Sequence, residues 1–199
     1  MPPLNMFQGK ARPSGLEFAT CKGCNNGTSA ADLVASYLAR LSQTGDSTGW
    51  NVREARDRHH MLQIKAPGFL RELYREEKNR QVLEQSPSGL LTPRMEITAD
   101  GPLLKAYLAV FAAKLGMALY REHIGEPMPA TGGVQTLCFL NAGLSKEVAS
   151  GTLRILPLRG TLKQGSFVVP EQFAYQYNCD EKSILAALAA STPTCTSSS

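Results

Sequence analysis

The chain has 199 residues, of which 43% are hydrophobic and 19% are charged, and its formal net charge is +4. This composition can fill one hydrophobic core and excludes a chain that is disordered throughout. A net charge of +4 is compatible with binding to a polyanion, but it is far below the net charge expected of a protein that clamps nucleic acid.

The first 28 residues are rich in Pro, Gly and Asn and show almost no periodicity, which indicates a small loop-dominated unit. Ser29 is a favourable N-cap, and Asp32 follows in the capping-box position. Apolar residues then recur at helical spacing as far as Leu41. We therefore expect a helix from Ser29 to near Ser42, followed by a turn-rich segment.

Residues 50–85 combine charged residues with apolar ones at helical spacing, and Pro67 and Gly68 interrupt the pattern once. This pattern predicts two helices. The stretch from Arg53 to Arg80 contains eight basic and five acidic residues. Such a stretch would suit nucleic-acid binding, but we favour a solvated helix surface with i,i+4 ion pairs. The alternation from Arg94 to Thr98 predicts a short strand.

The strongest periodic segment runs from Gly101 to His123, and its apolar residues recur at spacings of three and four. These residues are Leu104, Leu108, Phe111, Leu115 and Ala118. We expect this segment to be the core helix of the protein. Because Lys105 and Lys114 interrupt its apolar stretch, we predict that it does not span a membrane. The first ten residues also lack the features of a secretory signal.

After Gly132 and Gly133 the periodicity changes to that of strands. The predicted strands run from Val134 to Leu140, Thr152 to Leu158, Ser166 to Val169 and Phe173 to Tyr177. The segment from Ile184 to Ala190 suits either a helix or a closing strand. The expected fold class is α+β, with a helical middle followed by a mostly antiparallel sheet. We expect the Ser- and Thr-rich tail, residues 192–199, to be disordered.

Cys21 and Cys24 are the only two of the five cysteines that lie close together. An odd number with one close pair argues against a disulfide framework and predicts a reduced, cytoplasmic location. The Cys-x2-Cys spacing lets both sulfurs of a tight knuckle reach one Zn²⁺, although a structural zinc site takes four ligands. A redox-active pair and two unliganded surface thiols are the alternatives.

A short extended segment, Phe18 to Thr20, precedes the cysteines, and Asn25-Asn26-Gly27 leads from them into the predicted helix. Together with Pro2-Pro3 and Gly15-Leu16-Glu17-Phe18, this order resembles the motif of the HNH endonuclease family, specifically its bacterial HNH-like proteins. The resemblance covers about the first 45 residues. It implies a truncated ββα-metal unit over residues 1–45, ahead of an α+β body over residues 46–191.

In that family, two Cys-x2-Cys pairs hold a structural zinc. A His before the prolines and a His or Asn after the second pair hold a divalent ion, which polarises the DNA phosphodiester while the His activates water. The resemblance thus makes Cys21 and Cys24 zinc ligands and places Asn25 at the catalytic ion. Alignment on Pro2-Pro3 puts the His and the first cysteine pair before Met1, which implies an inactive or nearly inactive protein.

The other candidate ligands are single or poorly placed. The histidines are His59, His60 and His123, all in predicted helices, where we interpret them as solvated or core-edge residues. Adjacent residues point about 100° apart on a helix, which disfavours one metal shared by the first two histidines. We expect Cys138 to be a buried small hydrophobe, with Cys179 in a turn and Cys195 in the tail.

The sequence thus supports two hypotheses of different class. The first is an HNH-like nuclease-related protein with DNA as its partner, a structural zinc and a divalent catalytic ion. The second is a non-catalytic binding or structural protein in which the α+β body is functional and the zinc knuckle is a remnant.

Overall fold

The structure is a computed structural model that describes residues 3, 6–7, 18–41, 52–85, 89–138, 146–161, 163–164, 167–168, 173–180 and 183–190. Its helices are α1 (Lys22–Gly27), α2 (Ser29–Arg40), α3 (Val52–Lys65), α4 (Phe69–Leu73), α5 (Pro102–Ile124) and α6 (Lys146–Ile155). Its strands are β1 (Arg80–Gln85), β2 (Leu91–Glu96), β3 (Leu158–Thr161), β4 (Lys163–Gln164), β5 (Phe167–Val168), β6 (Ala174–Cys179) and β7 (Leu185–Ala190). The fold class is α+β, as the sequence predicts.

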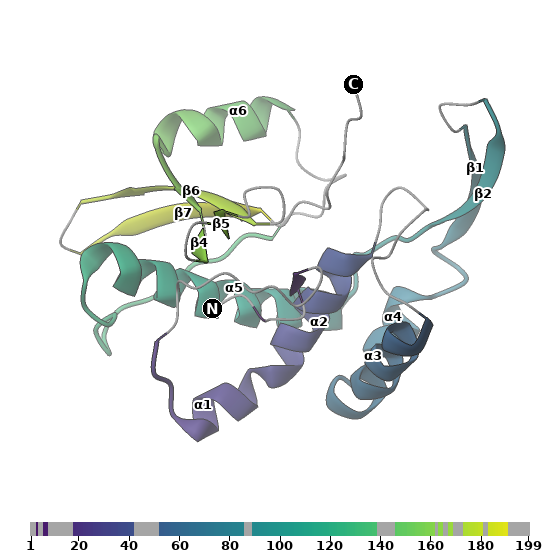
Figure 1. Ribbon diagram of the computed structural model, residues 1–199, viewed down its shortest axis with the longest axis horizontal. Coiled ribbons are helices and arrows are strands. Elements are labelled where there is room, and N and C mark those ends of the chain that lie inside the picture. Colours follow the sequence, from purple (N-terminus) through teal and green to yellow (C-terminus); the bar gives the residue numbers. More distant parts are fainter. Residues whose placement is uncertain are drawn as a thin grey trace.

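Helix α5 is the central element of the molecule (Figure 1). Strand β7 of the three-stranded sheet packs along it, and helix α2 also packs against it. The hairpin of β1 and β2 projects away from the helices (Figure 1). Pro102 in the first turn of α5 and Gly125 just after it are favourable start and stop residues. Gly125 has a φ of 88°, which a residue with a side chain rarely adopts.

Two hydrophobic clusters meet along α2 and α5. The buried residues of the first are Met6, Phe7, Ala35, Leu115, Ala118, Leu119, Phe173 and Tyr175. Those of the second are Leu33, Val34, Tyr37, Leu62, Ala66, Phe69, Leu73 and Leu104. The first cluster joins α5 to the sheet, and the second joins α2, α3, α4 and the start of α5. The described part of residues 1–45 therefore contributes to both clusters.

A buried carboxylate from α4 holds the N-terminus of α5. Glu72 accepts hydrogen bonds from the backbone N–H groups of Leu103 (3.0 Å) and Leu104 (2.8 Å). These groups have no partner within the helix, and the negative charge lies at the positive end of the helix dipole. Gly101 leaves room for the carboxylate, because a Cβ there would lie 2.0 Å from Cδ of Glu72. The charge pattern predicts a solvated surface, whereas Glu72 is buried because it caps α5.

All strand pairs among the described residues are antiparallel, in agreement with the prediction. Strand β6 lies between β3 and β7, β1 pairs with β2, and β4 pairs with β5. In β6, the side chain of Tyr175 is buried in the first hydrophobic cluster. The segment that suited either a helix or a strand is therefore strand β7, which closes the three-stranded sheet.

The helices predicted from periodicity are present in the structure. Helix α2 matches the segment predicted from residue 29, and α5 matches the segment predicted from Gly101. The break at Pro67 and Gly68 separates α3 from α4, and Gly68 has a φ of 83°. The predicted strand from Arg94 corresponds to β2, which begins earlier, at Leu91.

Several described segments differ from the sequence prediction. Residues 80–85 form β1 rather than helix, because β2 supplies antiparallel hydrogen bonds to this segment. Residues 134–138 have no regular secondary structure, since an alternating segment is a strand only when a partner strand pairs with it. Residues 152–155 belong to helix α6 rather than to a strand.

Helix α5 is long and apolar enough to cross a membrane, and 28% of its most apolar part is buried. It also packs against α2 and β7. The expectation that it does not span a membrane stays a prediction. The segment Gly15-Leu16-Glu17 of the motif and the tail 192–199 lie outside the described residues.

Candidate functional site

Cys21 and Cys24 lie at the start of helix α1. Residues 18–20, immediately before them, are neither helix nor strand. Cys21 is the N-cap of α1, with an extended backbone (φ −66°, ψ 153°), and Cys24 lies in the first turn. The pair is therefore fixed by an N-cap and one helical turn. The sequence predicts a loop-dominated knuckle here, whereas the structure has a helix at this position.

The two thiols are close to each other and open to solvent. Sγ of Cys21 accepts a hydrogen bond from the backbone N–H of Cys24 at 3.2 Å. Hydrogen bonds from Cys24, first from its thiol and then from its backbone, lower the pKa of Cys21. The side-chain hydrogen bond with Cys21 raises the pKa of Cys24. Both residues are exposed. The site thus favours one thiolate, the form that binds metals and attacks electrophiles.

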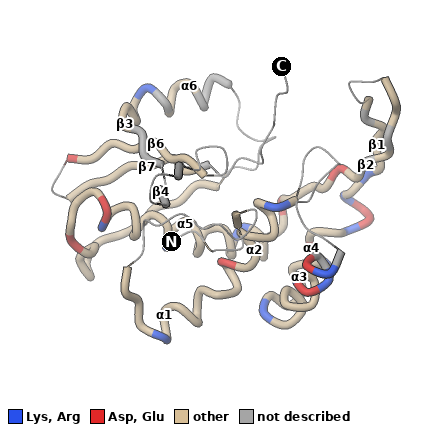
Figure 2. Tube along the Cα trace, viewed as in Figure 1, with Lys and Arg blue, Asp and Glu red and all other residues tan. Residues whose placement is uncertain are grey.

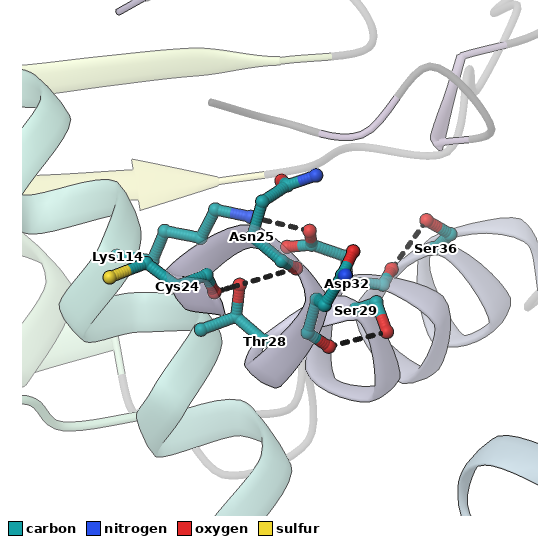
Figure 3. Close-up of polar contacts among 8 residues, drawn as sticks. Cys24, Asn25, Thr28, Ser29, Asp32, Ser36 and Lys114 are labelled. Carbon is teal, nitrogen blue, oxygen red and sulfur yellow. Dashed lines mark hydrogen bonds and ion pairs between the residues drawn. The ribbon is translucent and has the colours of Figure 1, made fainter. Parts of the chain in front are cut away.

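Asn25 follows the pair and is exposed. The Thr28 hydroxyl donates to the carbonyl oxygens of Cys24 (3.0 Å) and Asn25 (3.3 Å), and the Ser29 hydroxyl donates to Asn26 (2.8 Å). These bonds close the end of α1 where it meets α2, while the Asn25 amide projects from the helix (Figure 3). The prediction of Ser29 as an N-cap is wrong. Thr28 takes that position, without a side-chain capping bond, because α1 runs directly into α2.

A partly buried ion pair joins α2 to α5 close to this junction (Figure 3). Nζ of Lys114 lies 2.5 Å from Oδ2 of Asp32, and the two side chains are 18% and 19% exposed. The other carboxylate oxygen, Oδ1, is buried and has no hydrogen-bond partner among the described residues. Asp32 thus pairs across the helices instead of completing a capping box. The only sequence signal for this pair is the lysine that interrupts the apolar stretch of α5.

The thiol pair provides two of the four ligands that a structural zinc site takes. In the described ranges, no group of three or more His, Cys, Asp and Glu residues is placed to hold a metal ion. Two exposed thiols on one helical turn fit half of such a site. The described residues do not provide the other half.

The histidines lie in helices, as predicted, and two of them contact aromatic rings. His59 of α3 stacks with Tyr74, with ring centroids 6.0 Å apart, and meets the edge of Tyr37. His123 of α5 stacks on Tyr177 of β6 at 3.7 Å. Burial lowers the pKa of His123, although nearby Glu122 opposes the shift. These rings are thus packed at the edges of the two hydrophobic clusters rather than grouped with the cysteines.

The other described cysteines are single. Cys138 is exposed, so the prediction of a buried hydrophobe is wrong. Its segment does not join a sheet, and the alternation that predicted burial therefore has no core to face. Cys179 is partly buried at the end of β6 rather than in a turn. Cys195 lies outside the described residues.

Basic and acidic residues are mixed along α3 and α4 (Figure 2). Arg53, Arg56 and Asp57 are exposed on α3, and Glu54 lies 4.0 Å from Arg40 of α2. This interspersion agrees with the solvated surface that we favoured over a nucleic-acid-binding face. The mixture includes acidic side chains that would repel phosphates.

Comparison with protein-family models, with curated proteins and with solved structures finds no match to this chain.

Proposed function

We propose that the protein is related to HNH nucleases, that Cys21 and Cys24 form half of a structural zinc site, and that DNA is its partner. The observation that carries this proposal is the start of helix α1. There, an N-cap cysteine, a first-turn cysteine and an exposed asparagine follow one another on one short helix. Residues of the first turn of a helix are well placed to hold a tetrahedral ion together with a second ligand pair.

The surroundings of the pair support a metal-binding role. Both thiols are exposed, so a second ligand pair can approach them. Hydrogen bonds from Cys24 favour the thiolate form of Cys21, and a thiolate is the ligand that zinc requires. Because α1 contains no buried residue, its position depends on few packing contacts. A bound zinc ion would therefore contribute more to order here than in the core.

Asn25 is the candidate for the catalytic part of the proposal. When bound, a divalent ion at this position would supply Lewis-acid polarisation of a phosphodiester. The Asn25 amide oxygen can ligate such an ion, because hard divalent cations prefer oxygen ligands. Within the described residues no histidine is grouped with Cys21 and Cys24. We therefore propose DNA hydrolysis as the family activity and expect it to be absent or weak in this polypeptide alone.

Zinc analysis of three matched variants tests the structural half of the proposal. With a segment that carries a second cysteine pair added, wild-type protein should bind zinc, whereas Cys21→Ser and Cys24→Ser should not. Cys138→Ser is the matched control, because this thiol is exposed but single. Wild-type protein that binds no zinc in the presence of the second cysteine pair, or zinc retained after both substitutions at α1, would contradict the proposed site.

A nicking assay on supercoiled DNA tests the catalytic half. The zinc-loaded protein is incubated with DNA and Mg²⁺ or Mn²⁺, alone and after addition of a segment that carries a second cysteine pair and a histidine. Nicking that depends on that segment, and that Asn25→Ala reduces about 10-fold or more, is the expected result. If Asn25→Ala nicks DNA as fast as the wild-type protein does, Asn25 has no role in catalysis.

One observation favours the second hypothesis, a non-catalytic binding protein. The hairpin of β1 and β2 exposes Leu83, Leu91 and Met95, each more than 60% accessible. Their register places all three on one face, opposite Pro93, Gln85 and Gln81 respectively. Exposed apolar faces of this kind often mark interaction surfaces. Loss of DNA binding after Cys21→Ser would argue for the first hypothesis. Protein that binds no zinc and keeps its fold after Cys21→Ser would argue for the second.

A further inference from the structure

Cys21 and Cys24 are also placed to react with each other. In helical geometry, Cα atoms three residues apart are about 5 Å from one another. Disulfides join Cα atoms about 4.4–6.8 Å apart. The backbone N–H of Cys24 already holds Sγ of Cys21, with 3.2 Å between N and Sγ. A bond between the sulfurs therefore needs side-chain rotation and little backbone movement.

Both sulfurs are accessible to a small reagent. The two cysteines are exposed, and none of the residues of α1 is buried. Gly23 lies between them, and a Cβ at this position would lie 3.9 Å from Sγ of Cys21. The absence of a side chain at Gly23 leaves this side of the sulfur uncovered.

The other described cysteines lack this arrangement. Cys138 is exposed in a segment without regular structure, and Cys179 lies at the end of β6. Neither has another cysteine three residues away in the sequence. A mixed disulfide formed at either of them would therefore have no thiol at Cys-x2-Cys spacing to resolve it.

We propose that Cys21 and Cys24 form a reversible disulfide, with a low-molecular-weight disulfide such as oxidised glutathione as the oxidant. The Cys21 thiolate attacks one sulfur of the oxidant, which forms a mixed disulfide and releases one glutathione thiolate. The Cys24 sulfur, after giving its proton to water, attacks Cys21 Sγ and releases the second glutathione thiolate. The protein pair loses two electrons and two protons, and one oxidised glutathione becomes two reduced molecules.

This disulfide and a bound zinc ion exclude each other, because oxidation consumes both thiolate ligands. This consequence rests on the proposed zinc site, whereas disulfide formation itself does not. The pair would then bind zinc in a reducing environment and release it on oxidation.

Equilibration in glutathione buffers tests the proposal on the full, zinc-free chain. The protein is incubated at increasing ratios of oxidised to reduced glutathione, quenched with acid, alkylated and analysed by peptide mass spectrometry. The expected result is an internal Cys21–Cys24 disulfide that replaces the alkylated forms as the ratio rises, while Cys138 gains glutathione. If both α1 cysteines remain thiols, or carry glutathione only, the proposal is overturned.

The variant Cys24→Ser provides an independent test, with circular dichroism to show that its helices are intact. Without the resolving thiol, glutathione should accumulate on Cys21 several-fold more than it does on Cys21 in the wild type. Equal amounts of adduct on Cys21 in the two proteins would show that Cys24 does not resolve the mixed disulfide, and would overturn the proposal.

Adding zinc before the oxidant separates this inference from the proposed function. If the pair binds zinc, the internal disulfide should form more slowly than in the metal-free protein. If zinc has no effect but the disulfide still forms, the redox proposal is supported and the zinc proposal fails. If zinc binds but no disulfide forms at any buffer ratio, the redox proposal is overturned and the zinc site is supported.

Discussion

Helix α1 and the junction between α4 and α5 place their functional groups in opposite environments. Helix α1 has no buried residue, and local hydrogen bonds alone fix its two thiols. At the junction, Glu72 is 8% exposed and is locked against Gly101 and the first turn of α5. The exposed thiols at α1 are available for chemistry, whereas the buried junction contributes to the stability of the fold. Substitutions in α1 should change reactivity and leave the fold intact, whereas substitutions at the junction should unfold it.

The largest effect expected from this comparison is at Gly101. In Gly101→Ala, the new Cβ would displace the Glu72 carboxylate and break two charge-assisted hydrogen bonds to α5. We expect a loss of about 2–4 kcal/mol in the free energy of unfolding, measured by urea denaturation. The matched control is Gly27→Ala in α1, where a Cβ would meet nothing within 4 Å. Equal losses in the two variants would contradict the comparison.

A double-mutant cycle sharpens this test. Glu72→Ala removes the carboxylate and should cost about 2–3 kcal/mol, because two helix N–H groups lose their partner. In that background, Gly101→Ala should cost far less than in the wild type, since the group that it displaces is gone. Additive losses would mean that Gly101 has a role unrelated to Glu72.

The ion pair between Asp32 and Lys114 should have an intermediate effect. It is partly buried and joins α2 to α5. Lys114→Met leaves a partly buried carboxylate without its partner, and we expect a loss of about 1–2 kcal/mol in unfolding free energy. The control is Lys78→Met, which breaks an exposed pair with Asp100 and should cost well under 1 kcal/mol. A larger loss of unfolding free energy in Lys78→Met than in Lys114→Met would contradict the expectation that the partly buried pair stabilises the fold more than the exposed one.

The smallest effect should be the pH dependence contributed by His123. Its pKa in the folded protein is lowered, mainly by burial. The unfolded chain therefore binds a proton more readily, and stability falls as the pH drops through the ordinary histidine pKa towards the folded value. Between about pH 7 and pH 5, His123→Phe should lose less stability than the wild type in thermal unfolding. A steeper decline in the variant would contradict a lowered pKa of His123 in the folded protein.

The parts of the fold that local pattern determines could be predicted from the sequence. Helix α2 has one apolar face, and Gly68 marks the break between α3 and α4. Helix α5 is predicted from its run of apolar residues, although several of them, such as Val110 and Met117, are exposed rather than turned towards one core face. The sequence pattern predicts a helix over residues 80–85 and a strand over 134–138, and both predictions are wrong, because a strand depends on a partner elsewhere in the chain. Cys138 shows the consequence: its alternating surroundings suggest burial, but no strand among the described residues pairs with 134–138.

The candidate site was predictable to the same extent. The spacing of Cys21 and Cys24 and the adjacent Asn25 are local features, and the structure places all three on α1. The pairing of Asp32 with Lys114, and the burial of Glu72, join segments 82 and 31 to 32 residues apart in the sequence. No local pattern indicates which charged residue of a mixed stretch turns inward, because tertiary packing decides it.

X-ray absorption spectroscopy of the zinc-loaded protein tests the central claim most directly. Wild-type protein should show sulfur ligands at about 2.3 Å from zinc. In the double variant Cys21→Ser/Cys24→Ser, the sulfur shell should lose both of these ligands, while circular dichroism shows the same helices. A zinc spectrum that contains no sulfur shell, or one that the double substitution leaves unchanged, would contradict the claim that this pair is a metal half-site.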